Sequence, residues 1–217
     1  MIDLQNITLI TIDGVNPVLA AKALIYSSRG INFGKIKLLS FEEPKNLPSK
    51  IEFVKIDKLS YKEWEIFEVH NLNVYVDTEY CITIHADGFI LNPYNWIPEF
   101  LNYDYIGAPW PPELDGHIPH ELRVGNDALS LRSKRFLEIS ELKVPKEQIG
   151  ADIKMCRKYR NIYLNEGIKY APIELAMRFS LEYPIPECEY DLTKTFGFHN
   201  WNIIGNNHLK ELLNFKL

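Results

Sequence analysis

The sequence predicts an α/β protein that contains a parallel sheet, and three neighbouring segments carry that prediction. Residues 7–12 and 36–40 are apolar and rich in β-branched side chains, as buried strands are. Between them, residues 17–28 place apolar side chains at helical spacing. A strand, a helix and a second strand in this order form a βαβ unit, whose strands pair in parallel through a right-handed crossover.

The predicted helix at residues 17–28 carries signals for both of its ends. Pro17 suits a first helical turn, because proline has no backbone N–H to leave unpaired there. Gly30 lies where a glycine commonly ends a helix. The residues expected on the buried face of this helix are Val18, Ala21, Leu24 and Ile25.

The later elements are predicted from the same two periodicities, in chain order. Residues 51–56 alternate weakly as a third strand, and residues 80–84 form a short apolar strand. Residues 111–120 are too rich in proline and histidine for regular structure. The other predicted elements are helices at 61–72, 150–165 and 207–215, a strand at 123–132 that leads into a short helix ending at 137, and a short strand at 168–171.

Composition and charge limit the classes of function. The chain has 217 residues, which fits one domain with a full core. Its 46% hydrophobic and 24% charged residues are typical of a globular protein. The formal net charge of −5, without a local basic patch, gives no attraction to a phosphate backbone. We therefore expect no nucleic-acid partner.

The start of the chain and the cysteines predict a compartment. The first residues lack the basic start and apolar stretch of a signal peptide, and no run approaches the about 20 apolar residues of a membrane span. We expect a soluble, intracellular, cytoplasmic protein with no membrane span. The cysteines are odd in number and outside any CxxC pair, which disfavours a disulfide framework and a zinc cluster. Cys81, Cys156 and Cys188 are expected to be free thiols.

Two possible ligands follow the short strand at residues 80–84. Ligands of open α/β sheets gather beyond the carboxyl ends of strands, and His85 and Asp87 lie there. In an extended segment both side chains would share a face and could bind one Mg²⁺ or Mn²⁺ ion. Gly88 would let a ligand approach the backbone closely. The alternative is that Asp87 and Gly88 form a plain turn.

Three further candidates have ordinary alternatives. His199 could be a second metal ligand or a structural histidine among aromatic residues. Asp152, at the start of a predicted helix, could be a general base or a residue favoured there by the helix dipole. Trp110 could stack on a sugar ring or belong to the core.

A last candidate group surrounds a Gly-Asn pair. A turn at Gly125 and Asn126 could present backbone amides to an anion, and Arg132 could add its guanidinium. The alternative is a plain hairpin. No Walker loop, GxGxxG, GxSxG, HExxH or kinase signature is present in the sequence. Nucleotide binding by a phosphate loop is therefore not expected.

A series of short motifs spans most of the chain, from residue 7 to residue 200. They are Thr78-Glu79, His85-Ala86-Asp87-Gly88, Asn92-Pro93 with Trp96, residues 103–110, Val124-Gly125-Asn126, residues 130–133 and residues 196–199. In this order they resemble a largely uncharacterised family of GT-A-like glycosyltransferase domains. Small viral glycosyltransferase domains that build capsid glycans are similar in size and layout.

The resemblance implies a single GT-A-like, Rossmann-related domain with a central mixed, mainly parallel sheet flanked by helices. Its first half, about residues 1–90, would bind the nucleotide sugar, and about residues 91–217 would bind the acceptor. In GT-A enzymes a D-x-D motif holds Mn²⁺ or Mg²⁺ against the donor diphosphate. Asp87 matches its second acidic position, and His85 replaces the first. His199 matches the C-terminal histidine that serves as a further metal ligand.

The resemblance also implies roles for the remaining residues. Asp152 matches the catalytic carboxylate of inverting members, although the usual Glu-Asp pair reads Ala-Asp here. Asp127 departs from an expected double glycine and would contact the donor sugar or the acceptor. Thr11 and Asp13 match the position that contacts the nucleoside. The full donor set is Thr11, Asp13, His85, Asp87, Gly125, Asn126, Asp127 and Arg132, with Trp110 at the acceptor.

Together these expectations describe a metal-dependent glycosyltransferase. It would move a sugar from a nucleotide-sugar donor of the UDP- or GDP-sugar type to a glycan or another hydroxyl acceptor, with inversion at the anomeric carbon. The cofactor would be Mn²⁺ or Mg²⁺, held by Asp87 and His199. Two alternatives stay open. One is a non-catalytic nucleotide-sugar or carbohydrate-binding module, and the other is a metal-dependent hydrolase or nucleotidyltransferase.

Overall fold

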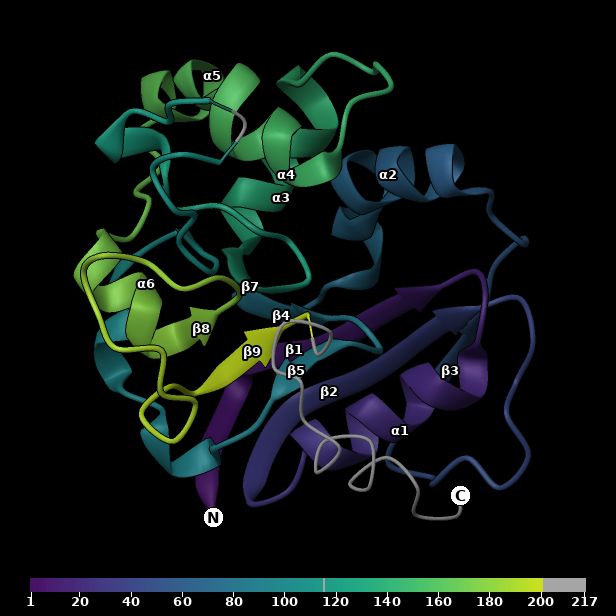
Figure 1. Ribbon diagram of the computed structural model, residues 1–217. Coiled ribbons are helices and arrows are strands. Elements are labelled where there is room, and N and C mark those ends of the chain that lie inside the picture. Colours follow the sequence, from purple (N-terminus) through teal and green to yellow (C-terminus); the bar gives the residue numbers. More distant parts are fainter. Residues whose placement is uncertain (115, 201–217) are drawn as a thin grey trace.

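A six-stranded sheet forms the centre of the protein (Figure 1). The computed structural model describes residues 1–114 and 116–200. The strands are β1 (Ile2–Asp13), β2 (Ile31–Ser40), β3 (Glu52–Lys55), β4 (Tyr80–Ile84), β6 (Tyr105–Ile106) and β7 (Leu129–Ser133). Their order is β3-β2-β1-β4-β7-β6. Strands β3, β2, β1 and β4 are parallel, and β7 is antiparallel to β4 and β6. The predicted mixed, mainly parallel sheet is confirmed.

Helix α1 (Pro17–Ser27) is the crossover between β1 and β2, as predicted. Its first N–H groups are capped by the Asn16 side chain, which accepts from Leu19 N at 3.1 Å. The predicted buried face was partly wrong, because Val18 is 46% exposed. The face that packs on the sheet is made largely of small residues, which let the helix approach β1 and β2 closely. Its buried members are Ala20, Ala21, Ala23, Leu24, Tyr26 and Ser27.

Helices α2 (Tyr61–His70) and α3 (Lys134–Lys143) cover the other face of the sheet, together with the 3₁₀ turn η1 (Leu72–Tyr75). The start of α2 is fixed by a capping box between Ser60 and Glu63, a signal that the sequence prediction missed. Helix α3 is longer than predicted, since the expected helix ended at residue 137. Ser133 caps it by accepting from Phe136 N at 3.1 Å.

The helix predicted at residues 150–165 is broken into three pieces. Helix α4 (Ala151–Ile153) passes into a π-helical turn, η5 (Lys154–Lys158), and then into α5 (Arg160–Asn165). In the wider turn, Tyr159 N donates to Lys154 O at 3.0 Å, five residues back. Gly167, at φ +77°, follows this region in the left-handed conformation that commonly ends a helix.

A second, three-stranded sheet was not predicted. It consists of β5 (Gly88–Ile90), β9 (Gly197–His199) and β8 (Ser180–Leu181), in the order β5-β9-β8, and α6 (Ile173–Phe179) precedes β8. Strands of two or three residues are too short to show a period. The strand predicted at residues 168–171 is reduced to one bridge, between Tyr170 and Tyr105. The helix predicted at residues 207–215 lies outside the described residues.

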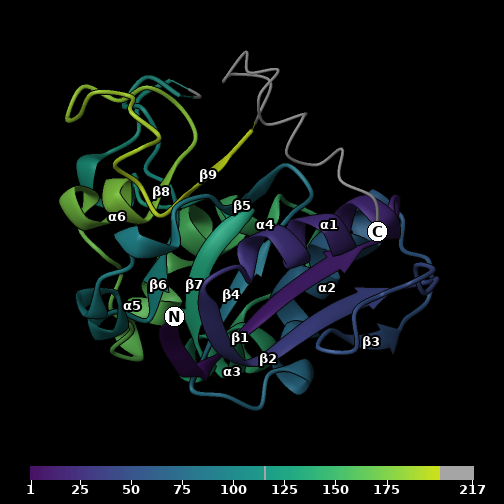
Figure 2. The ribbon, with the colours of Figure 1, turned by 90° about the horizontal axis from the view of Figure 1, so that it is seen from below.

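Alternating side chains of the central sheet serve two cores. On one face, Leu9 and Leu38 pack with α1, β5 and β9, and α1 lies on this side in both views (Figures 1 and 2). On the other face, Ile10 and Leu39 pack with α2, η1 and α3. This confirms an α/β sheet flanked by helices. The division into a nucleotide-binding half and an acceptor-binding half stays a prediction.

Two smaller expectations concern cysteines and membrane spans. Cys81 and Cys156 are buried, Cys188 is half-buried, and all three are free thiols, as predicted. Across residues 1–114 and 116–200, the helices are all too short or too polar to cross a membrane.

Candidate metal and donor site

The segment from His85 to Gly88 is a tight turn that joins β4 to β5. His85 N donates to Gly88 O at 2.9 Å, and Gly88 N donates back to His85 O at 3.3 Å. The segment is therefore a turn and not extended as expected, but the turn still brings a ligand atom of His85 near one of Asp87. Gly88 is needed for packing, since a Cβ there would lie 3.0 Å from the His199 ring.

The turn brings Asp87 to His199, which arrives on β9. In the antiparallel pair of β5 and β9, Gly88 lies opposite His199. The Nε2 atom of His199 is 3.7 Å from Asp87 Oδ1. One ligand atom from each of His85, Asp87 and His199 falls within 4.8 Å of the others. The structure thus brings the expected metal ligands Asp87 and His199 together with His85, which was expected as a donor contact and as a possible ligand of the same ion.

The chemistry of these three groups fits a divalent cation. A carboxylate and two imidazoles are ordinary ligands of such ions. The Nε2 atom of His85 is buried and has no hydrogen-bond partner among residues 1–114 and 116–200, and buried polar atoms are normally hydrogen-bonded. Burial lowers the pKa of His85 to about 3, and the positive charges of His199 and Arg132 act in the same direction. The ring is therefore neutral, as a ligand must be.

The other ring nitrogen of His199 faces Glu182, a residue that the sequence prediction missed. Nδ1 lies 3.0 Å from Glu182 Oε1. Asn126 Nδ2 donates to Glu182 Oε2 at 2.9 Å. Burial alone would lower the pKa of His199, but the hydrogen bond and charge of Glu182, followed by the charge of Asp87, raise it. No local pattern marks Glu182, which directly follows a strand of two residues.

A pocket of about 280 Å³ adjoins this cluster. Residues 12–15, at the end of β1, and residues 85–87, at the end of β4, form one side of it, and Leu59, Tyr61 and Trp64 form the other. The order of the strands reverses between β1 and β4, since β2 lies on the far side of β1. Ligands of open α/β sheets bind in the crevice at such a reversal. Of the predicted donor set, Asp13, His85 and Asp87 line this pocket.

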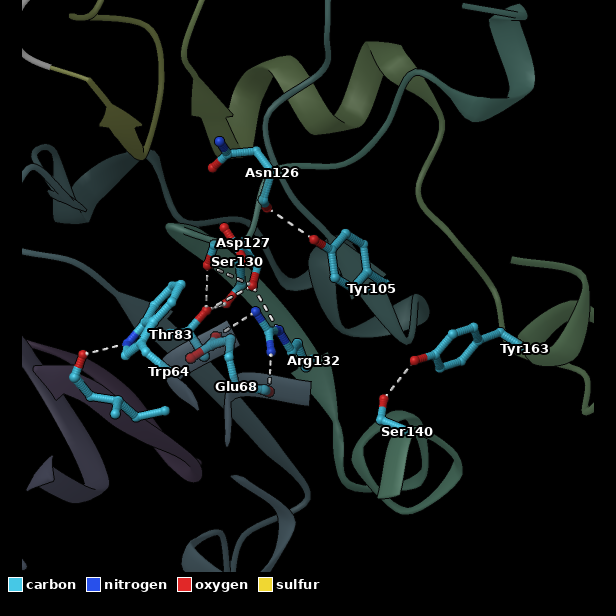
Figure 3. Close-up of polar contacts among 11 residues, drawn as sticks. Trp64, Glu68, Thr83, Tyr105, Asn126, Asp127, Ser130, Arg132, Ser140 and Tyr163 are labelled. Carbon is cyan, nitrogen blue, oxygen red and sulfur yellow. Dashed lines mark hydrogen bonds and ion pairs between the residues drawn. The ribbon is translucent and has the colours of Figure 1, made fainter. Parts of the chain in front are cut away.

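Trp64 connects three parts of the pocket. Its Nε1 donates to Ile12 O at 3.0 Å, as Figure 3 shows. The edge of its ring meets His85 with 5.0 Å between ring centroids. Tyr61, which is 73% exposed, stacks on it at 6.2 Å and an interplanar angle of 19°. An open aromatic face therefore borders the pocket. The sequence placed Trp64 on a helix but gave no sign that it reaches β1.

The two residues predicted at the nucleoside lie differently. Asp13 lines the pocket, and its Oδ1 accepts from Val15 N at 2.8 Å and from Asn16 N at 2.5 Å. This carboxylate thus shapes the loop after β1. Thr11 is buried within the sheet and is not among the residues that line the pocket.

Asp127 and Asp152 are neighbouring acidic groups, and neither is among the described residues that line the pocket. Burial raises the pKa of Asp152 to about 7, and the charge of Asp127 adds to the rise. Burial also raises the pKa of Asp127 to about 6, with the charge of Glu68 adding to it and that of Arg132 opposing it. The charges of both aspartates help to raise the pKa of Tyr61, where burial is the largest cause. The charge of His199 opposes the rise in the pKa of each aspartate. Asp152 Oδ1 also accepts from Ile153 N at 2.6 Å, as at a helix start.

Three predicted contact residues lie in the interior instead. Arg132 is completely buried: Nη2 lies 2.7 Å from Glu68 Oε1, and Nε donates to Ser130 Oγ at 2.9 Å (Figure 3). Its guanidinium therefore ties α2 to the sheet and is absent from the pocket lining that is described. Trp110 is 2% exposed and covers Gly125, where a Cβ would lie 2.0 Å from its ring. The core alternative describes Trp110, and Gly125 is a glycine because this ring covers it.

The mainly parallel central sheet, flanked by helices, matches a GT-A-like, Rossmann-related fold. The chain is similar to the crystal structure of the galactosyltransferase LgtC in complex with donor and acceptor sugar analogs, with TM-score 0.53 and 14% identity over 98% of this chain and 95% of that one. The chain belongs to the family described as "protein of unknown function (DUF5672)", whose model matches residues 70–199.

Two other comparisons complete this result. A putative glucose-1-phosphate thymidylyltransferase from Bacillus anthracis, solved in complex with a sucrose, gives a TM-score of 0.42 at 15% identity, over 76% of this chain and 86% of that one, and carries no argument here. No curated protein matches the chain. The similarity to LgtC supports the fold and leaves the activity to the site. The likeness to viral capsid-glycan domains stays a prediction.

Proposed function

We propose that this protein is a metal-dependent glycosyltransferase that uses a nucleotide-sugar donor. One observation carries the proposal: ligand atoms of His85, Asp87 and His199 lie within 4.8 Å of one another beside a pocket at the ends of β1 and β4. A nucleoside and a diphosphate need such a combination of a pocket and an adjoining cation site. The similarity of the fold to a galactosyltransferase supports the proposal without proving it.

The pocket suits the nucleoside part of a donor of the UDP- or GDP-sugar type. Tyr61 and Trp64 form a stacked aromatic wall on which a base could lie. In other proteins, stacking on an aromatic side chain contributes about 1 to 3 kcal/mol to the binding free energy of a base. The loop at residues 12–15 offers backbone groups to the base or the ribose. Among the residues that the structure describes, those that line the pocket include no lysine or arginine, so a bound cation would match the charge of a diphosphate there.

Asp87 and His199 would hold that cation, with His85 as a third ligand. Two imidazoles favour Mn²⁺ over Mg²⁺, which prefers oxygen ligands. When bound, a divalent cation stabilises the negative charge of the leaving diphosphate.

Asp152 is our candidate for the general base. A base acts best when its pKa lies near the working pH, and the pKa of Asp152 is raised to about 7. Its carboxylate would take the proton from an acceptor hydroxyl, from a glycan or another molecule, as the oxygen attacks the anomeric carbon. Direct attack of this kind inverts the configuration. Asp127, whose charge acts on Asp152, would contact the donor sugar or the acceptor.

The experiment measures release of nucleoside diphosphate from a panel of UDP- and GDP-sugars, with and without Mn²⁺ and with glycan acceptors. We expect Mn²⁺-dependent release in the wild type and none in Asp87→Ala. Asp3→Asn is the control. It removes a carboxylate near the start of β1, at the other end of this strand from the pocket, and should behave as wild type. Binding of a nucleotide sugar without any turnover would favour a binding module. Turnover that is independent of Asp87 would contradict the proposal.

A further inference from the structure

A second pair of residues surrounds the candidate metal ligand His199. Glu182 is 5% exposed and Asn126 is 3% exposed, so both are shielded from water. One oxygen of the Glu182 carboxylate faces His199 Nδ1 at 3.0 Å, and the other accepts from Asn126 Nδ2 at 2.9 Å. Each carboxylate oxygen therefore has its own partner, and Glu182 cannot turn without losing one of them.

This arrangement selects one form of the His199 ring. A carboxylate only accepts hydrogen bonds, so Nδ1 must carry the hydrogen that faces Glu182. The Asn126 amide also lies 3.0 Å from Nδ1, which would suit the other tautomer. A hydrogen bond to a charged group is stronger than one between neutral groups, so the Glu182 carboxylate selects the tautomer of His199. The lone pair of neutral His199 is then on Nε2, the atom that faces Asp87.

The backbone of Asn126 supports the same geometry. Its φ is +59°, in the left-handed region that asparagine tolerates better than most residues. Its backbone oxygen accepts from the Tyr105 hydroxyl at 2.9 Å. Figure 3 shows this oxygen on the side of Tyr105 and the side-chain amide on the opposite side. The left-handed turn is thus fixed by Tyr105 and directs the amide at Glu182.

We propose that Glu182 and Asn126 are positioning residues for metal binding, which hold His199 with Nε2 presented to a cation shared with Asp87. The inference rests on the proposed function, because it requires a metal between Asp87 and His199. Carboxylates that orient a ligating histidine commonly change metal affinity by about 10- to 100-fold when they are mutated. A network that only joined β8, β9 and the segment before β7 would leave that affinity unchanged.

The test measures binding of Mn²⁺ alone, from the loss of its free EPR signal, in the wild type and three variants. Glu182→Ala should weaken binding by about 10- to 100-fold. Glu182→Gln keeps the shape but not the charge, and should fall between Glu182→Ala and the wild type. Asn126→Gly keeps the left-handed φ while removing the amide, and should weaken binding by a few-fold. Asp3→Asn is the matched control and should bind as wild type does.

A second measurement reads the ring directly. In ¹⁵N NMR spectra without metal, His199 of the wild type should carry hydrogen on Nδ1, and Glu182→Ala should lose this preference. If Glu182→Ala does not fold, Glu182→Gln and Asn126→Gly carry the test. Equal Mn²⁺ affinity in the folded variants, with an unchanged His199 ring, would overturn the inference and leave the proposed function standing. A wild type that binds no Mn²⁺ would remove both.

Discussion

The Nε2 atom of His199 lies 3.7 Å from Oδ1 of Asp87, although one residue ends β9 and the other belongs to the turn after β4. This separation is too long for a direct hydrogen bond and leaves room for a cation that both atoms would bind. The contact joins the central sheet, through the turn after β4, to β9, the last strand that the structure describes.

Asp87→Asn should separate stability from metal binding. The Asp87 side chain is 39% exposed, and surface substitutions of this kind usually change the free energy of unfolding by less than about 0.5 kcal/mol. The loss of a charged ligand should nevertheless weaken Mn²⁺ binding at least about tenfold. Urea unfolding and calorimetric titration of the metal-free protein measure the two effects. Equal losses of stability and affinity would indicate a structural role for the carboxylate.

The contribution of Asp152 to the free energy of unfolding of the metal-free protein should fall as pH rises from about 4 to about 7, whereas the lowered pKa of His85 gives a contribution that rises over this range. The pKa of Asp152 is about 7 in the folded state against 3.8 for an ordinary aspartate, so folding favours the protonated form. That stabilisation is complete below pH 3.8 and is lost as pH rises through 7.

Asp152→Asn should remove the loss of stability that accompanies ionisation of Asp152. At pH 8 the variant should be about 1 to 2 kcal/mol more stable than wild type, since one pKa unit corresponds to about 1.4 kcal/mol and the site is partly open to water. At pH 4 the advantage should disappear. Urea unfolding at both values checks this, with Asp3→Asn as the charge-matched control. A variant whose stability tracks the wild type at every pH would show that Asp152 titrates normally.

The buried pair of Glu68 and Arg132 should behave as a structural unit. Arg132→Met alone leaves the Glu68 carboxylate buried without its partner, and should cost about 3 to 5 kcal/mol. The double variant Glu68→Gln/Arg132→Met should recover part of this loss, because no unpaired charge remains. A double-mutant cycle by urea unfolding gives the coupling. If Arg132→Met kept wild-type stability and weakened only donor binding, Arg132 would be a donor contact, as the sequence predicted.

Gly125→Ala should destabilise the protein without touching the chemistry. A Cβ at Gly125 would lie 2.0 Å from the Trp110 ring, and forced overpacking of a core typically costs about 1 to 3 kcal/mol. Thermal unfolding of the wild type and of Gly125→Ala measures the change. Wild-type stability in Gly125→Ala would mean that Trp110 can move aside, as an acceptor-binding side chain would need to.

The sequence by itself determined the βαβ start, the mainly parallel sheet and the place of Asp87 at the end of a strand. Each of these follows from a local pattern. Runs of β-branched residues indicate buried strands, Pro17 indicates a helix start, and a polar residue after an apolar strand indicates the end of that strand. Such patterns extend over a few residues, so they also failed locally. They missed β5, β8 and β9, which are too short to have a period.

Tertiary structure alone decided which distant groups meet. Pairing of β5 with β9 sets His199 beside Asp87, and the end of β8 brings Glu182 to the same ring. Tertiary packing also buries two residues that were predicted to contact ligands. Arg132 pairs with the buried Glu68 carboxylate, and Trp110 packs over Gly125. A residue's own neighbours in sequence fix its conformation and burial tendency. Its partner is fixed by the register of strands far away in the chain, which no local period records.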